Sequence, residues 1–304
     1  MSDFVQQQNS ICDFSNSDSW VILSPIEQSI KRKIEAVGTP LRDWDIQINY
    51  GIKTGFNDAF VISTEKREEI LANCQTEDER KRTAELIRPI LRGRDIKRYG
   101  YDWANLWLIY IPWHFPYQFD ESIQGASEKA EKAFKEQYPT VYSHLLQYKE
   151  PLSKRNKAET GIRYEWYAMQ RWGAKYWEDF SKQQIVWIEL SDEPKFALAE
   201  EIMSVNTVFF MTGEHILHLL GLLNSKLITW YFKHCIGTTS GVGTNRWLKY
   251  TIEQIPMAPV CQKLEDLSLL ISKSYDQEIN QEIDLSVCRL YNLNDEETTY
   301  IVNQ

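Results

Sequence analysis

The chain has 304 residues, of which 43% are hydrophobic, and a formal net charge of -9. This length and apolar content indicate a soluble globular protein with a sizeable buried core. The five cysteines are widely spaced and never form a Cys-x-x-Cys pair, which excludes a disulfide framework or a zinc finger and favours a reducing cytoplasm.

The charge is distributed unevenly along the chain. Residues 80–98 contain eight basic residues against two acids, a local net charge of +6. Residues 215–250 contain four basic residues and no acid, whereas residues 251–304 contain ten acids against three basic residues. Most of the acidity therefore belongs to the tail, and an acidic total does not exclude a nucleic-acid-binding face.

The N-terminal part begins with a polar lead-in over residues 1–19 that has no basic region followed by an apolar stretch, and therefore does not resemble a signal peptide. The sequence Ser24-Pro25-Ile26-Glu27 has a capping serine, a proline at the first helical position and a glutamate that closes a capping box. It predicts a helix over 25–37. Alternation then predicts strands at 45–50 and 59–62, joined by a polar loop with two glycines.

A second capping box, Thr76 with Glu79, predicts a helix that ends before Pro89, with the basic run following it on a turn around Gly93. Apolar runs at 106–111 and 184–188 predict strands covered on both faces. The charged section between them, 127–150, has helical character and is broken at Pro139.

The C-terminal half starts with a predicted strand at 206–210 and a long apolar helix at 214–235. That helix is interrupted by polar residues such as Asn224 and Lys226, which favours a core helix over a membrane span. A Gly/Ser/Thr-rich loop follows over 237–247, and apolar stripes then predict two helices, with a last short helix capped by Asn294.

Four segments resemble, in this order along the chain, the TaqI-like C-terminal specificity domain. This domain is the target recognition part of type IIG restriction-modification enzymes and of adenine methyltransferases in phage-exclusion (BREX-type) systems. The resemblance spans about residues 20–260, and the tail from Ile283 to Leu293 resembles the helical end that follows this domain. The four segments are Gly51–Phe60, Arg88–Tyr99, Gly221–Leu227 and Gln254–Pro256.

The resemblance implies an α+β fold with a mixed or antiparallel sheet, flanking helices and a helical C-terminal tail. It divides the chain into a lead-in (1–19), a DNA target recognition domain (20–258) and the tail (259–304). It also implies sequence-specific reading of double-stranded DNA for a neighbouring adenine-N6 methyltransferase, with or without a nuclease, which would bind S-adenosylmethionine. The chain has no Pro-Pro dipeptide and hence no Asn-Pro-Pro-Tyr catalytic motif, so we expect no catalysis and no cofactor on this chain itself.

The candidate DNA-binding residues come from three loops or turns and one aromatic stretch. Arginine forks suit phosphates and guanine edges, polar loop residues suit base edges, and aromatic rings can stack on bases. The alternatives are that the arginines pair with acids such as Asp95, that the first loop is a simple hairpin, and that the tryptophans are core residues. The candidates are Lys53, Thr54, Asn57, Arg88, Arg92, Arg94, Lys97, Arg98, Trp166, Thr244, Asn245 and Arg246.

Two other kinds of site are not expected. His215 and His218 stand three apart on a helix, but no fourth ligand is spaced to complete a metal site. Glu193-Pro194-Lys195 supplies one half of a nuclease signature, and no Pro-Asp dipeptide supplies the other. The remaining alternative is a protein-interaction subunit of a restriction-modification or phage-exclusion system, with little or no DNA binding of its own.

Overall fold

The first element within the described residues is the helix predicted from its capping box. In the computed structural model, which describes residues 23–236 and 245–304, helix α2 spans Pro25–Val37. The backbone N–H of Ser24 donates to the Glu27 carboxylate at 2.7 Å, which satisfies one of the free donors at the helix start. Ile30 and Ile34 are fully buried, so the apolar stripe faces the core as predicted.

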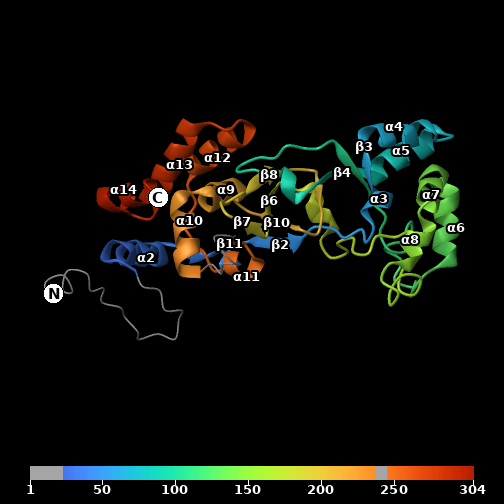
Figure 1. Ribbon diagram of the computed structural model, residues 1–304, viewed down its shortest axis with the longest axis horizontal. Helices are drawn as coiled ribbons and strands as arrows, with labels where there is room; N and C mark the ends of the chain where they lie inside the picture. Colours follow the sequence, from blue (N-terminus) through green and yellow to red (C-terminus); the bar gives the residue numbers. More distant parts are fainter. Residues whose placement is uncertain (1–22, 237–244) are drawn as a thin grey trace.

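A four-stranded antiparallel sheet occupies the middle of the molecule (Figure 1). Its strands, in spatial order, are β2 (Ile46–Tyr50), β10 (Val208–Gly213), β6 (Gln184–Ile188) and β8 (Ala197–Ala199). The strand predicted at 206–210 corresponds to β10 but starts only at Val208. The Val208 N–H donates to the Val205 carbonyl, which holds residues 205–207 in a turn. The strand predicted at 184–188 is confirmed.

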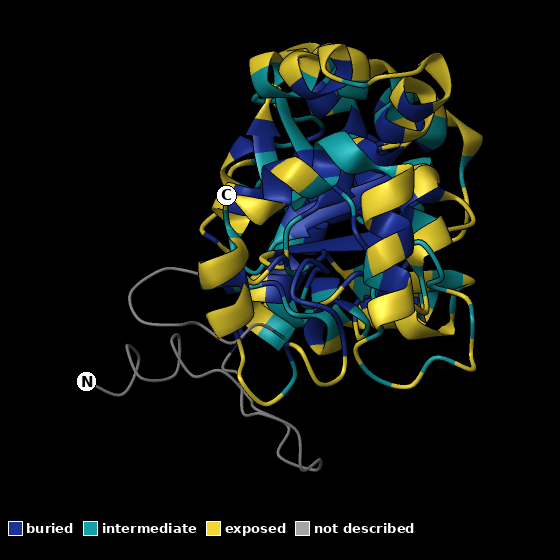
Figure 2. Ribbon diagram, turned by 90° about the vertical axis from the view of Figure 1, so that its right-hand side faces the viewer, coloured by how far each residue is buried: buried dark blue, intermediate teal, exposed yellow. Residues whose placement is uncertain are grey.

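Both faces of this sheet are buried, each in a different hydrophobic core. Trp187 and Met211 face the core that contains helix α9, whereas Val186 and Phe210 face a second core. This follows from the period of two along each strand, which sends neighbouring side chains to opposite faces. Buried strands accordingly lie inside a shell of helices with exposed outer faces (Figure 2).

A second four-stranded sheet lies within the other core. Its order is β3 (Val61–Ser63), β5 (Leu106–Ile109), β4 (Ile87–Leu91) and β9 (Met203–Ser204), with β4 and β9 parallel. Around it pack α3 (Asn57–Phe60), α4 (Thr64–Ala72), α5 (Glu77–Leu86), α6 (Glu128–Gln137), α7 (Pro139–Leu146) and α8 (Lys149–Lys154). Helix α5 is capped by Thr76, and the predicted break at Pro139 is confirmed, since α7 begins there.

The two strands predicted around the Gly51 loop are present, but the second starts later than predicted and the alternative of a simple hairpin is wrong. Strand β2 pairs with β10 in the central sheet, whereas β3 belongs to the second sheet, and residues 57–60 form helix α3 instead of the start of a strand. The alternating pattern indicates extended backbone but not its partner, which is why two neighbouring strands read as a hairpin. The loop is instead a crossing between sheets.

The C-terminal helices lie with α2 at one end of the molecule, opposite α4–α8 (Figure 1). The predicted single helix at 214–235 is broken into α9 (Ile216–Asn224) and α10 (Lys226–Tyr231), because Ser225 accepts the N–H of Ile228 and starts a new helix. A π-type turn follows at Phe232–Ile236. The predicted tail helices are confirmed as α12 (Gln262–Lys273), α13 (Gln277–Leu290) and α14 (Asp295–Val302).

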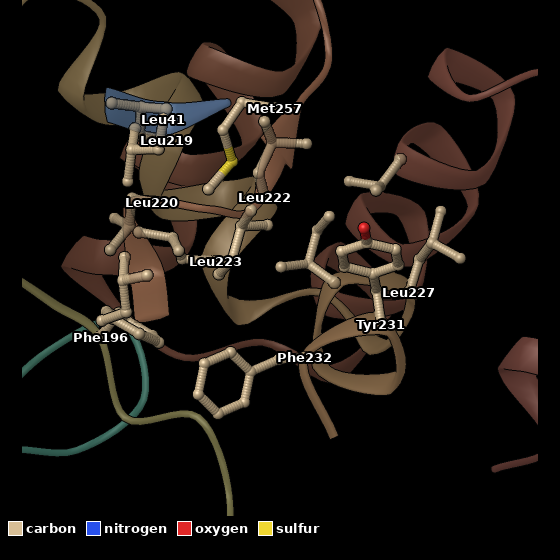
Figure 3. Close-up of a cluster of buried hydrophobic side chains, with 14 of the residues drawn as sticks. Leu41, Phe196, Leu219, Leu220, Leu222, Leu223, Leu227, Tyr231, Phe232 and Met257 are labelled. Carbon is tan, nitrogen blue, oxygen red and sulfur yellow. The ribbon is translucent and has the colours of Figure 1, made fainter. Parts of the chain in front are cut away.

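The tail packs on α9 through apolar side chains. Figure 3 shows Leu219, Leu220, Leu222 and Leu223 of α9 together with Leu227, Tyr231 and Phe232 from the segment that follows. The same core contains Leu264, Ile271, Ile283 and Val287 of the tail. At Gly221, a Cβ would lie 2.6 Å from Ser268 Oγ of α12, so glycine allows the two helices to approach. None of the helices within 23–236 and 245–304 combines the length and apolarity needed to cross a membrane.

The remaining elements are short. Two small antiparallel ribbons pair β1 (Thr39–Pro40) with β12 (Pro256–Met257), and β7 (Leu190–Ser191) with β11 (Asn245–Arg246). Helix α11 spans Lys249–Ile252, and 3-10 turns occupy Leu41–Asp43, Gly93–Asp95 and Trp177–Ser181. The turn at Gly93, predicted from the sequence, follows strand β4 and not a helix.

Candidate nucleic-acid interface

Four short segments meet where the two sheets join, and we call them the junction strip. Across the strip, in order, lie residues 90–92, 203–205, 51–54 and 170–171. Leu91 pairs with Ser204 in parallel, and Val205 N–H donates to the Leu91 carbonyl at 3.2 Å. Ile52 N–H donates to the Ser204 carbonyl at 2.8 Å. The strip thereby places residues 90–92 of the arginine-rich run one strand away from the Gly51 loop, although some 35 residues separate them along the chain.

Gly51 makes this crossing possible. A Cβ at this position would lie 2.1 Å from the Val205 carbonyl oxygen and 2.3 Å from that of Ser204. These are backbone atoms that cannot turn aside as a side chain does. Gly51 is therefore required for close backbone approach, whereas Gly55, with φ of +79°, is required for a left-handed conformation.

The outer pair of the strip carries two cations side by side. Lys53 N–H donates to the Arg171 carbonyl and Arg171 N–H donates to the Lys53 carbonyl, both at 2.9 Å. In such a hydrogen-bonded antiparallel pair the Cα atoms are about 5.5 Å apart and both side chains lie on the same face. Arg171 is exposed and Lys53 is half-buried.

This pair has no acidic partner within the residues that the structure describes. Neither side chain has a carboxylate within ion-pair distance. Burial raises the pKa of the nearby Tyr176 phenol, and the Arg171 charge opposes that increase. Like charges directly opposite each other on a sheet destabilise it. A polyanionic ligand would relieve the repulsion between the charges of Lys53 and Arg171, so this pair suits such a ligand.

Arg155 fixes the geometry of this pair from inside the protein. Only 8% of its surface is exposed, and its guanidinium donates to the Trp166 and Ala168 carbonyls at 2.8 Å each and to the Thr54 carbonyl. Burial lowers the pKa of Arg155 to about 10, so it keeps its charge at neutral pH. It therefore positions the strands on both sides of the Lys53–Arg171 pair without itself being accessible to a ligand.

Within the Gly51 loop, Thr54 and Asn57 have different positions. Thr54 is buried, and its hydroxyl donates to the Asn57 amide oxygen at 2.6 Å and accepts from Phe56 N–H at 3.2 Å. Asn57 is exposed, and only its amide oxygen is used in the protein. Asn57 can therefore still donate two hydrogen bonds to a ligand, whereas the Thr54 hydroxyl is occupied.

The basic run divides into engaged and accessible side chains. Arg92 makes a bidentate ion pair with Asp95 through two contacts of 2.8 Å, and this hydrogen bonding lowers the pKa of the Asp95 carboxyl. Arg98 donates to the Asn224 carbonyl and lies over the Tyr99 ring, while Lys97 pairs with Asp102.

Arg88 and Arg94 differ from these three. Both are exposed, and neither has a carboxylate within ion-pair distance in the described part of the chain. Arg88 lies on β4, and Arg94 lies in the turn that follows the strip. The pairing with Asp95, which the sequence left open, thus applies to Arg92, and Arg94 is the arginine of this turn that is available to a ligand.

The other candidates lie apart from the strip. Trp166 is largely buried and its ring N–H donates to Glu131 at 2.7 Å. Asn245 is buried and donates to the Asp192 carbonyl at 3.2 Å, and Arg246 pairs with Glu189 at 2.6 Å. Thr244 lies outside the described residues.

Sequence reasoning missed Arg171 and Lys175 as candidates. Both are exposed and, with Asn49 and Tyr176, line a surface hollow of about 630 Å³ beside the strip. The available signal was their position in the stretch of residues 151–176, where basic and aromatic residues alternate. The pattern did not distinguish the buried Arg155 from the exposed Arg171, because both stand beside aromatic residues or turns.

Comparison with protein families gives one match. The model of the TaqI-like C-terminal specificity domain matches residues 88–257, which confirms the resemblance seen in the ordered motifs. The matched range includes the basic residues from Arg88 to Arg98, Arg171, and the strip segments 90–92 and 203–205. A comparison with curated proteins gives no match.

Two solved structures align with this chain, each over only part of a much longer chain. The type IIL restriction-modification enzyme MmeI, solved in complex with DNA, aligns with a TM-score of 0.52 and 13% identity over 88% of this chain and 37% of that chain. The type IIG restriction endonuclease BpuSI aligns with a TM-score of 0.49 and 13% identity over 90% and 32%. The chain thus spans about a third of these enzymes. The MmeI alignment confirms the expected α+β fold with antiparallel sheets and C-terminal helices.

Proposed function

Because this chain belongs to the TaqI-like C-terminal specificity domain family, we propose that it recognises a short sequence in duplex DNA and is not catalytic by itself. The observation that carries this proposal is the Lys53–Arg171 pair, two adjacent cations without acidic partners among the described residues. Arg94, Arg88, Lys175 and Asn57 extend this surface with further accessible donors. Such a surface suits phosphates and the acceptor-rich edges of bases.

We propose that two kinds of residue make two kinds of contact, one with the phosphates and the other with the base edges. Lys53 and Arg171 contact phosphates, because their backbone positions are fixed by reciprocal hydrogen bonds. Arg94 and Asn57 read base edges, since an arginine fork matches guanine and an amide matches adenine. Arg92 and Arg98 hold the turn and the neighbouring helix end in place through Asp95 and the Asn224 carbonyl. In this scheme residues 20–258 recognise DNA, and residues 259–304 form a helical tail.

The chemistry would belong to a partner. We propose an adenine-N6 methyltransferase, with or without a nuclease, as a fused domain or a separate subunit that binds S-adenosylmethionine. The small share of the solved relatives that this chain covers supports a role within a larger assembly. A cytoplasmic restriction-modification or phage-exclusion system is the setting that fits such a module. The test for a separate partner is co-purification of the chain with the product of a neighbouring methyltransferase reading frame.

DNA binding itself is tested with a random-sequence duplex. Fluorescence anisotropy from low to moderate salt should give an affinity that falls steeply with ionic strength, because each neutralised phosphate releases counterions. A selected sequence should bind more tightly than the random duplex at the same salt. Absence of binding even at low salt would refute the proposal and would favour a protein-interaction subunit instead.

A further inference from the structure

A second hollow lies beside the junction strip, and many of the residues that line it are aromatic. It has a volume of about 280 Å³ and is lined by helix α5, strand β4 and the loops that follow β5 and precede β6. Pockets for drug-sized ligands have volumes of about 300–1,000 Å³. This hollow is therefore of a size for one small planar group.

Residues within or next to three of the four segments of the strip line this hollow. Met203 belongs to the strip, Arg88 stands on β4 just before residues 90–92, and Trp172 follows Arg171. Trp172 also lines the hollow that contains Arg171, so the two hollows are neighbours and one strand of nucleic acid could reach both. None of the residues assigned to phosphate contact is needed to line it.

Two aromatic rings at the rim are exposed to an unusual degree. Phe119 is 61% exposed and Trp177 is 37% exposed, and their ring centroids lie 5.5 Å apart at an interplanar angle of 44°. Trp172 lies next to Phe119, with centroids 6.3 Å apart. Large aromatic side chains lose much favourable burial when they stay in water. Grouped exposed rings of this kind mark a contact site, and they offer faces for stacking.

Inside the hollow, one polar side chain has no partner. The Gln118 amide makes no hydrogen bond within the described residues, and its oxygen Oε1 is completely shielded from solvent. A buried amide without a hydrogen bond costs roughly 1–3 kcal/mol in protein mutational data. The side chain as a whole is half-buried, so rotation of its amide group would present the oxygen to an amino or imino group of a ligand in the hollow.

The charges around the hollow are balanced. Arg82 and Arg88 line it together with Glu85 and Glu201. Both arginines are exposed; Arg82 donates one hydrogen bond to the Gln137 carbonyl at 3.1 Å, whereas Arg88 makes none within the described residues. This balance does not suit a free polyphosphate, but it suits an uncharged base whose backbone phosphate reaches Arg88.

We propose that this hollow receives a single unstacked nucleobase from DNA bound on the junction strip. The base stacks against Phe119 and Trp177, and its amino or imino hydrogen is accepted by Gln118. This inference rests on the proposed function, since the strip must first hold the strand. It adds a site for an extrahelical base within the specificity domain itself.

The test compares a random duplex with the same duplex carrying one unpaired 2-aminopurine. Stacking of one base on aromatic side chains contributes about 1–3 kcal/mol, so the protein should bind the bulged duplex about 5- to 150-fold more tightly. The emission of 2-aminopurine should change on binding. Phe119→Ala should remove both the preference and the emission change, and its exposed position makes the substitution tolerable for folding.

Gln118→Leu is the second variant and keeps the volume while removing the hydrogen-bonding group. It should fold at least as stably as the parent, since an unsatisfied buried polar group is lost, and it should retain the emission change and the part of the preference that comes from stacking, while losing the part that comes from the hydrogen bond. A Lys53→Gln/Arg171→Gln variant should bind both duplexes more weakly and keep their ratio. Equal binding of both duplexes by the parent, or a preference unchanged in Phe119→Ala and Gln118→Leu, overturns this inference alone. Absence of binding to either duplex overturns the proposed function with it.

Discussion

The double substitution Lys53→Gln/Arg171→Gln tests the central part of this interface. Both changes remove a charge while keeping a polar side chain of similar reach. The two backbone hydrogen bonds between these residues, at 2.9 Å each, do not depend on the side chains. The fold should therefore be preserved, and relief of the repulsion between two adjacent cations should leave stability unchanged or slightly higher.

The size of the effect follows from the number of phosphates that two cations can neutralise. Each phosphate contact contributes about 0.9 to the slope of log K against log salt, so the double variant should have a slope smaller by about 1.8. At an ionic strength of about 0.15 M, this change in slope corresponds to an affinity lower by about 30-fold. Sequence preference should change little, because phosphate contacts carry no base information.

The assay is fluorescence anisotropy on one duplex at four or more salt concentrations. The matched control is Lys135→Gln/Lys273→Gln, which removes the same charge from two exposed lysines on α6 and α12 that also have no carboxylate within ion-pair distance. If the control lowered the slope as much as the Lys53/Arg171 variant, only net charge would matter, and the assignment of the junction strip would be refuted.

Three further predictions concern how the strip is built. Gly51→Ala should destabilise the protein by about 3 kcal/mol in urea unfolding, because its Cβ would meet backbone carbonyls. Gly93→Ala should cost less than about 1 kcal/mol, since the nearest obstacle is a methyl group of the Ile188 side chain. Equal losses in the two variants would contradict this. Arg155→Met removes the guanidinium hydrogen bonds to the Trp166, Ala168 and Thr54 carbonyls and should cost about 3 kcal/mol, with a matching loss of DNA affinity; unchanged unfolding would show that these contacts are not needed. Asp95→Asn should cost about 1 kcal/mol at neutral pH, because the bond to Arg92 lowers the pKa of this carboxyl below its ordinary 3.8. A lowered pKa stabilises the fold above the unfolded value, so the difference between parent and variant should be constant above about pH 5 and disappear as the pH falls below about 4; a difference that grows in acid would contradict it.

Several features of the fold were predictable because they depend on neighbours in sequence. The capping box at Ser24–Glu27 fixes the start of α2, and Thr76 fixes the start of α5, since both use hydrogen bonds over three residues. The same holds for the break at Pro139. The buried strand at 184–188, with Trp187 in the core, follows from a continuous apolar run.

Other predictions were wrong where the outcome depended on long-range partners. The alternating residues around Gly51 indicated two strands but could not show that each joins a different sheet. The apolar run at 214–235 indicated helix, yet the side chain of Ser225 ends one helix and starts another. Local pattern defines extended or helical backbone, whereas pairing is chosen by tertiary packing.

For the candidate site, the sequence by itself pointed to a basic run, a glycine loop and a basic-aromatic stretch, and the order of four motifs, which include the run and the loop, indicated the family whose model matches residues 88–257. It could not rank their side chains. Only the tertiary structure decided that Arg92 pairs with Asp95 and that Arg155 is buried, while Arg171 lies beside Lys53 without an acidic partner in the described part of the chain. The physical reason is that the freedom of a charged side chain depends on which carboxylates and carbonyls surround it, and those come from distant parts of the chain.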